Sequence, residues 1–281
     1  MRFKSADTRW IRNRMSAEFL TADPLRLPRL RHGFFTRNGG VSTGAFASLN
    51  CSLSGKDDAA AVRENRSRAA AALRLEHSML CGLTQVHGKR VVVAEEPWPE
   101  NQRPEADGVV TRRAGVALGI ITGDCAPVLF ADPVAGVIGA AHAGWRGAVA
   151  GVLEETVFAM ETLGTARRDV IAVVGPCIHQ PSYEVAADLR DAVLARDLAD
   201  MRFFAHGKRE GRWQFDLPGY CAARLLALDV AVSIMTHDTL ADEARFFSHR
   251  RNTLAGGGPI GHQLSAIVID DRGPQGLGSP P

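Results

Sequence analysis

Three apolar runs punctuated by glycine constrain the fold of this chain more than any other feature of its sequence. They are AGVALGIITGD (114–124), AGVIGAAHAG (135–144) and VIAVVGP (170–176). Apolar runs of this length between turn residues predict strands that are buried on both faces. After the second run the period becomes helical, from Trp145 to Leu163, with apolar side chains near one face. This mixture of strands and helices with many glycine turns predicts an α/β or α+β fold.

The other predicted elements continue the same pattern. The segment 56–75 is rich in Ala, Arg and Glu and predicts a helix with Asp57 or Asp58 near its start. Further helices are predicted at 184–198 and 218–228. Further strands are predicted from β-rich or apolar runs within 79–88, 89–96, 230–236 and 264–270.

The patterned sequence indicates one domain, over residues 30–270, with no linker or repeat inside it. Residues 1–29 are polar, rich in Arg and aperiodic, and we interpret them as a partly disordered N-terminal extension in which Met15 is an alternative start. Residues 271–281 are rich in Pro and Gly and predict a disordered tail.

Composition narrows the class of protein. Hydrophobic residues make up 46% of the chain and charged residues 23%, which is enough apolar material for a real core. A net charge of +2 gives no electrostatic footprint for nucleic acid or an anionic membrane. No apolar run approaches the roughly 20 residues that span a bilayer. The five cysteines are widely spaced without a CxxC pair, which favours a reducing compartment, and without a signal peptide we expect the cytoplasm.

Three short motifs join a metal-ligating side chain to a backbone of small residues. His87 lies in QVHG between two predicted strands, Cys125 in GDCAP after a buried strand, and His142 in HAGWRG between a strand and a helix. Side chains at strand ends converge on open clefts in α/β proteins, and glycine permits close backbone approach. The three side chains therefore form a candidate site.

Two imidazoles and a thiolate are ligands that suit Zn²⁺, and three protein ligands leave a fourth position open. Zinc would hold Cys125 as a thiolate. Asp124, next to this ligand, is a candidate for orienting it or for carrying a proton. The spacing of His87, Cys125 and His142 is long and irregular, so the pattern alone also permits structural histidines and a buried cysteine.

Seven blocks of the chain, in order, resemble one family. These blocks are HGFFTRNGGVSTGAFASLN (32–50), QVHG (85–88), ADGVVT (106–111), GDCAPVLFAD (123–132), HAGWRG (142–147), GPCIHQPSYEV (175–185) and RFFSHRR (245–251). The chain is similar over roughly 31–269 to the bacterial laccase-domain family, which is named for polyphenol oxidases and regarded as zinc-dependent purine nucleoside phosphorylases.

The resemblance implies a single domain with a four-layer α/β/β/α sandwich and mixed sheets. It implies a metal centre of His87, Cys125 and His142, and phosphorolysis of adenosine, inosine, guanosine and methylthioadenosine, together with adenosine deamination. The expected partners are a nucleoside and phosphate, with no nucleic acid and no membrane, and the chain is expected to be a monomer or a small homo-oligomer.

Two positions depart from the pattern of that family. Gly123 stands where the family usually has Ala, which leaves the ligands intact. His262 stands where the family usually has Arg after Gly261. If that Arg helps to bind an anion, a histidine in its place would weaken phosphate binding near pH 7.

Four further residues are candidates for binding substrate or phosphate. Arg37 lies beside a glycine-rich turn that can cradle an anion, and Arg146 follows a ligand motif at a predicted helix start. Gln85 shares a strand face with His87 and either binds the base or pairs with backbone. Arg250 is the fourth. Cys177 and Tyr183 are interpreted as core packing and left outside the site.

Three alternative functions compete with this one, and one of them, a cysteine hydrolase, uses the same residues as the zinc site. A copper-dependent polyphenol oxidase (laccase) needs clustered His-x-His ligands, whereas no two of the nine histidines here are two positions apart. A cysteine-type hydrolase or amidase would use Cys125 as nucleophile with His142 or His87 as base. A non-catalytic binding module would leave the Cys and two His at strand ends unexplained.

Overall fold

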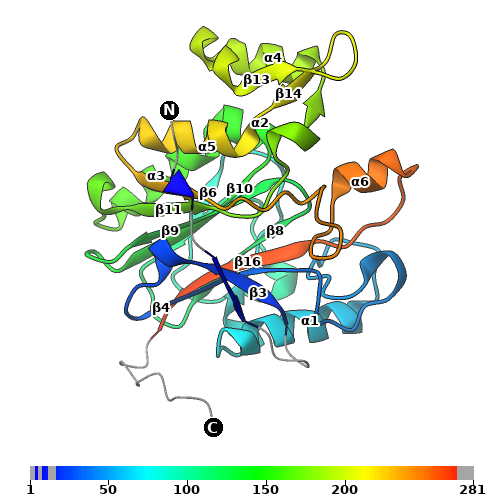
Figure 1. The fold of residues 1–281 in the computed structure, drawn as a ribbon. Helices are drawn as coiled ribbons and strands as arrows, with labels where there is room; N and C mark the ends of the chain where they lie inside the picture. Colours follow the sequence, from blue (N-terminus) through cyan, green and yellow to red (C-terminus); the bar gives the residue numbers. More distant parts are fainter. Residues whose placement is uncertain (1–3, 6–7, 12–16, 271–281) are drawn as a thin grey trace.

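Two large β-sheets lie face to face at the centre of the structure, a computed structural model that describes residues 4–5, 8–11 and 17–270 (Figure 1). The first sheet has the order β1 (Lys4–Ser5), β15 (Ala231–Ile234), β11 (Ile171–Val174), β9 (Ala126–Asp132), β10 (Val137–Ala143), β7 (Gly108–Thr111) and β6 (Val91–Val93). The second has the order β2 (Thr8–Ile11), β3 (Phe19–Ala22), β4 (Leu30–Phe35), β16 (Gln263–Ile269), β8 (Ala117–Thr122) and β5 (Leu80–Cys81). Both sheets mix parallel and antiparallel pairs.

Helices cover the outer face of each sheet. The helices are α1 (Ala59–Ala72), α2 (Trp145–Ala150), α3 (Val152–Thr162), α4 (Ala187–Leu194), α5 (Leu217–Leu226) and α6 (His249–Leu254). Helices α3 and α5 pack on the first sheet, and α1 packs on the second (Figure 1). A small sheet of β12 (Glu184–Val185), β14 (Trp213–Phe215) and β13 (Phe204–His206) lies beside α4.

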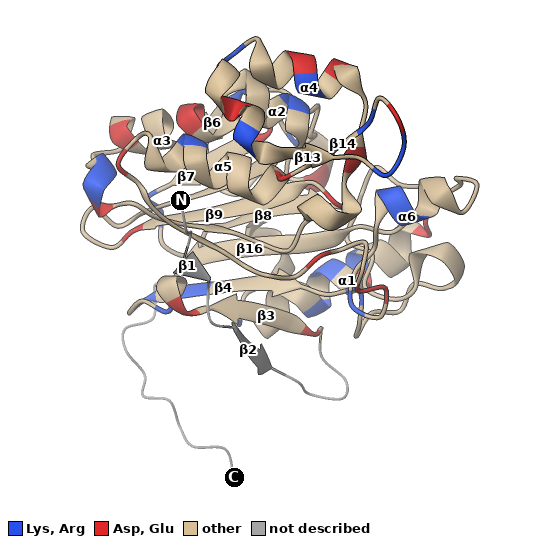
Figure 2. Ribbon diagram, turned by 45° about the horizontal axis from the view of Figure 1, so that its top comes forward, with Lys and Arg blue, Asp and Glu red and all other residues tan. Residues whose placement is uncertain are grey.

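The alternation of side chains along each strand builds the layers. In β9, Val128 and Phe130 pack towards the helices, whereas Leu129 and Ala131 pack between the two sheets. In β8, Leu118 likewise faces the first sheet. Because neighbouring residues of a strand point to opposite faces, strands buried on both faces need an apolar residue at every position. Figure 2 shows the charged residues concentrated on the helices and loops, and the central strands largely without them.

The predicted four-layer α/β/β/α architecture is confirmed, and most predicted elements are present. Helix α1 begins after Asp58, whose side chain accepts a hydrogen bond from the backbone N–H of Ala61 at 2.8 Å. The single helix predicted from Trp145 to Leu163 is wrong, because Gly151 has φ of 104° and divides it into α2 and α3. Such a left-handed conformation suits glycine and cannot continue a helix.

Three other differences concern the bounds of a helix, a strand that was not predicted and the structure of the N-terminal segment. The helix predicted at 184–198 is shorter, because its first residues form β12. Strand β9 is not among the strands predicted from sequence, although apolar residues follow Pro127 without interruption. Strand β3 lies within the predicted N-terminal extension, 1–29, and its side chains are buried in the second sheet. Met15 and the predicted tail, 271–281, lie outside the described residues. Among the described residues, no helix is both long and apolar enough to cross a membrane.

Candidate metal centre

Three separate segments bring His87, Cys125 and His142 together near the ends of strands β8 and β10. His87 lies in the loop between β5 and β6, Cys125 lies between β8 and β9, and His142 lies in β10. Their ligand atoms all lie within 4.8 Å of one another, and Sγ of Cys125 is 3.9 Å from Nε2 of His87. The two imidazole rings are 4.7 Å apart, edge to face. The predicted ligand set therefore forms one cluster.

Asp107, immediately before β7, holds two of the three side chains in place. Its buried carboxylate accepts hydrogen bonds from the backbone N–H groups of His87 at 2.9 Å and Gly88 at 2.7 Å. Nδ1 of His142 lies 2.8 Å from the same carboxylate. His87 has φ of 59°, an unusual conformation for a residue with a side chain, and these bonds stabilise it. Asp107 was not among the site residues predicted from sequence, although it lies in the motif ADGVVT.

Gly144 leaves the space in which the ligands meet. A Cβ at this position would lie 2.9 Å from Sγ of Cys125 and 3.0 Å from Cδ2 of His87. Both distances are shorter than ordinary van der Waals contacts, so a side chain here would push the ligands apart. Gly144 of the motif HAGWRG is therefore required by the packing of the cluster.

The cluster favours a thiolate at Cys125. Burial opposes ionisation of the thiol, but the charge of His142 and hydrogen bonds from His142 and His87 outweigh it and lower the pKa of Cys125 to about 6. Burial also opposes the charged form of His142, and the Cys125 thiolate and Asp107 together raise the pKa of His142 to about 9. Two imidazoles and a thiol that readily ionises to a thiolate are a donor set that fits a metal ion such as Zn²⁺.

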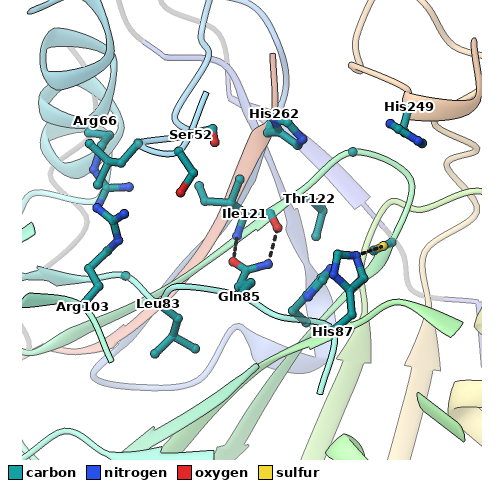
Figure 3. A pocket seen from close by; sticks show the side chains of 16 residues that line it. Ser52, Arg66, Leu83, Gln85, His87, Arg103, Ile121, Thr122, His249 and His262 are labelled. Carbon is teal, nitrogen blue, oxygen red and sulfur yellow. Dashed lines mark hydrogen bonds between the residues drawn. The ribbon is translucent and has the colours of Figure 1, made fainter. Parts of the chain in front are cut away.

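Two cavities meet at the cluster. The larger, of about 410 Å³, extends from His87, Cys125 and His142 along β8 (Figure 3). The smaller, of about 280 Å³, contacts His87 and Cys125 from the other side. His249, at the start of α6, lines both cavities. Sequence analysis missed His249 as well, although it lies in the motif RFFSHRR.

Gln85 and Asp124 lie at the site, but their polar atoms contact protein. Gln85 donates to the carbonyl oxygen of Ile121 at 2.7 Å and accepts from its N–H at 2.8 Å (Figure 3). Of its two alternative roles, pairing with the backbone is the one observed. The carboxylate of Asp124 accepts from the side chains of Thr239 and Ser248, at 2.6 and 2.9 Å, and from the backbone N–H of Arg250 at 2.6 Å.

The predicted arginines separate into two groups. Arg146 and Arg250 line the smaller cavity. Arg37 lines neither cavity: it donates to the carbonyl oxygens of Ala47 at 2.9 Å and Glu243 at 3.2 Å, and its guanidinium lies over the ring of Phe247. Arg37 therefore joins the glycine-rich turn to distant segments of backbone.

Three residues that were not predicted to form the site can be placed relative to its cavities and the core. Tyr183, interpreted from sequence as core packing, lines the smaller cavity. Cys177 is buried in the core between the first sheet and its helices, as predicted. His262 lines the larger cavity, and burial together with the charges of His249 and His142 lowers its pKa to about 4. A neutral imidazole therefore stands where the family usually has Arg.

Comparisons with known proteins agree with this architecture. Residues 31–270 match the family described as multi-copper polyphenol oxidoreductase laccase. A purine nucleoside phosphorylase of Deinococcus radiodurans is 42% identical over 252 residues, which cover 88% of this chain and 93% of the relative. A purine nucleoside phosphorylase of Pseudomonas aeruginosa is 38% identical over 85% of this chain and 95% of the relative.

Solved structures show the same fold. A Neisseria meningitidis protein of the family DUF152 matches with a TM-score of 0.80 and 35% identity, covering 90% of this chain and 99% of that protein. The structure of YlmD from Geobacillus stearothermophilus matches with a TM-score of 0.82 and 29% identity, covering 94% and 100%. By sequence and by fold, the chain belongs to the laccase-like family of multi-copper polyphenol oxidoreductases, whose relatives here include enzymes named purine nucleoside phosphorylase.

Proposed function

We propose that this protein is a zinc-dependent purine nucleoside phosphorylase that also deaminates adenosine. The observation that carries the proposal is the cluster of His87, Cys125 and His142 at the junction of two cavities. The larger cavity, about 410 Å³, lies within the range of about 300–1,000 Å³ that is typical of small-molecule sites. The names of the relatives supply the substrate class, and adenosine, inosine, guanosine and methylthioadenosine are the proposed substrates.

In phosphorolysis, an oxygen of phosphate forms a bond to C1′ of the ribose while the bond from C1′ to the purine breaks. The transition state has the character of an oxocarbenium ion, as in glycoside cleavage. When bound by His87, Cys125 and His142, Zn²⁺ would supply Lewis acidity at the wall that the two cavities share. Asp107 would orient His142 by accepting from Nδ1, which leaves Nε2 for the metal.

The remaining candidates act around this centre. We propose that Arg146 and Arg250 stabilise negative charge in the smaller cavity, since both line it. Asp124 is proposed as a positioning residue rather than a proton carrier, because its three hydrogen bonds tie the Cys125 loop to Thr239 and to the start of α6. Gln85 is proposed to position the loop that carries His87 through its paired bonds to Ile121.

One observation favours a second candidate function. The pKa of Cys125 is lowered to about 6 beside two histidines, an arrangement that also activates a cysteine nucleophile. A metal-free cysteine hydrolase would use these same residues. Copper has less support, because among the described residues the group of His87, Cys125 and His142 is the one candidate metal cluster, whereas laccase chemistry needs several clustered copper sites. Since all five cysteines are free, we propose a reducing, cytoplasmic location.

Metal analysis and a nucleoside panel test the proposal together. We expect about one zinc per chain and release of purine base from inosine that requires phosphate. Cys125→Ser should lose most of the zinc, because a hydroxyl is a poor zinc ligand. Full zinc content with lost activity in Cys125→Ser would favour the hydrolase, and stoichiometric copper without zinc would refute the zinc assignment. If the unmodified protein releases no base with phosphate, the phosphorylase proposal is wrong.

A further inference from the structure

The larger cavity has a second polar end, formed by Arg66 and Arg103, away from the metal ligands. Figure 3 shows the two guanidinium groups together at one end of the cavity and His87 at the other. Arg66 lies on α1, and Arg103 lies in the segment between β6 and β7. A Cβ at Gly82 would lie 3.4 Å from Nη2 of Arg66 and 3.5 Å from Cδ of Arg103. The two side chains therefore border the same stretch of the cavity wall.

Arg66 carries a hydrogen-bond donor that no described residue accepts. The residue is only 1% exposed. Nε donates to the carboxylate of Glu100 at 2.7 Å, and Nη1 donates to the carbonyl oxygen of Cys51 at 3.3 Å. Nη2 is buried and has no hydrogen-bond partner among the described residues. Native proteins pair nearly all buried polar groups, so this donor calls for an acceptor inside the cavity.

The positive charge at this end exceeds the negative charge. The Glu100 carboxylate contacts both Arg66 and His77, the latter at 2.9 Å. Arg103 donates from Nη1 to the backbone carbonyl oxygen of Glu100 at 2.7 Å. This carbonyl group carries no net charge, so it does not neutralise the guanidinium. Of the two guanidinium groups, only that of Arg66 is therefore paired directly with the Glu100 carboxylate. Burial and the charge of Arg66 lower the pKa of Arg103 despite Glu100, and the opposite charge of a bound anion would offset this shift.

We propose that Arg66 and Arg103 form a subsite for a phosphate group at this end of the larger cavity. Planar guanidinium groups bind phosphate oxygens through paired, charge-assisted hydrogen bonds, and the free Nη2 of Arg66 supplies one such donor. This chemistry fits inorganic phosphate, the co-substrate of phosphorolysis, and equally a phosphate carried on a purine nucleoside. The choice between these sources rests on the proposed function; anion binding itself does not.

Calorimetric titration of the zinc-loaded protein tests the subsite. The probes are inorganic phosphate, adenosine and adenosine 5′-monophosphate. Arg103→Gln removes one charge, and Arg66→Lys keeps the charge beside Glu100 but removes the free Nη2. Each variant should weaken phosphate-group binding roughly 10- to 100-fold, the range for losing a charge-assisted hydrogen bond. Arg168→Gln, at a side chain that is 83% exposed, is the matched control and should change nothing.

The pattern of losses identifies the source of the phosphate. Weaker binding of inorganic phosphate assigns the subsite to the co-substrate, and weaker binding of the monophosphate with unchanged adenosine affinity assigns it to a carried phosphate. The proposal is overturned if neither inorganic phosphate nor the monophosphate binds, or if neither Arg66→Lys nor Arg103→Gln changes their affinity. It is also overturned if only Arg146→Gln, in the smaller cavity, weakens their binding. Arginine-dependent anion binding without phosphorolysis would refute the proposed function alone. Phosphorolysis with unchanged phosphate affinity in both variants would refute the subsite alone.

Discussion

Nδ1 of His142 lies 2.8 Å from the carboxylate of Asp107, and this contact determines which ring nitrogen of the imidazole is free. The nitrogen bonded to Asp107 carries the proton, so Nε2 is the nitrogen that is available to a metal. The same carboxylate accepts from the backbone of the loop that carries His87. One buried aspartate thus positions two histidines that are far apart in the sequence.

Asp107→Asn should weaken zinc binding about 10- to 100-fold, the usual cost of removing the partner that orients a metal-ligating histidine. The amide has one acceptor oxygen where the carboxylate has two, so the His87 loop and the His142 ring would compete for it. Competition against a zinc chelator, with the zinc content measured at each step, gives the affinity.

Asp132→Asn is a matched control for that substitution. Asp132 is also buried, but its carboxylate accepts backbone N–H groups of Val134 and Ala135 in a turn at the end of β9. We expect it to lower the melting temperature without changing zinc affinity. Equal zinc affinity in both variants would show that Asp107 does not orient His142.

His87, Cys125 and His142 could be proposed as candidates from sequence because each is flanked by glycine or another small residue near a predicted strand, a pattern seen within about five positions. The resemblance to the laccase-domain family then selected them as metal ligands over structural histidines and a buried cysteine. The buried strands were predictable for a similar reason, because apolar runs report burial directly. The four-layer arrangement followed only from the resemblance to the laccase-domain family. Gly151 was less visible, since one glycine within a helical period is often tolerated.

Residues whose role depends on distant partners could not be predicted. Asp107 contacts a loop 20 positions away and a strand 35 positions away, and neither distance leaves a local pattern. Arg66 lies in a helix rich in Ala, Arg and Glu, which indicates a solvated face, yet it is 1% exposed. Arg37 was predicted as an anion ligand from the glycine-rich turn beside it. Its contact with the carbonyl oxygen of Glu243, 206 positions further along the chain, leaves no local pattern that sequence could show.

Gly144→Ala should lower zinc affinity while leaving the fold intact. The added Cβ would lie 2.9 Å from Sγ of Cys125 and 3.0 Å from Cδ2 of His87, so at least one ligand must move by a few tenths of an ångström. Zinc content and far-ultraviolet circular dichroism measure the two effects separately.

Gly55→Ala is the control, because a Cβ there meets only Ser52 at ordinary van der Waals distance. It should bind zinc normally. Wild-type zinc affinity in Gly144→Ala would mean that the ligands do not need the space that this glycine leaves.

Arg37→Ala should reduce stability rather than phosphate binding. It removes hydrogen bonds to the carbonyl oxygens of Ala47 and Glu243, and each lost bond costs about 1 kcal/mol in a partly buried site. We expect a lower melting temperature and an unchanged KM for phosphate. A raised KM with unchanged stability would restore Arg37 to the site and contradict the contacts described here.

The last prediction concerns the thiol of Cys125 in protein from which metal has been removed. Its pKa is lowered to about 6, because the charge of His142 and hydrogen bonds from both histidines outweigh burial. A lowered pKa places the thiolate above pH 6, so roughly ten thiolates are present for each thiol at pH 7. The rate of alkylation by iodoacetamide should therefore be constant above about pH 7 and fall as the pH drops through 6.

The other cysteines do not interfere with this measurement, because Cys51, Cys81, Cys177 and Cys221 are buried and burial raises the pKa of each of their thiols. Adding zinc should suppress alkylation, since the metal takes the thiolate. A midpoint near 8.5 would contradict the thiolate–imidazolium pair. Rapid alkylation that continues in zinc-loaded protein and abolishes activity would identify Cys125 as a nucleophile instead of a metal ligand, and the hydrolase would become the better assignment.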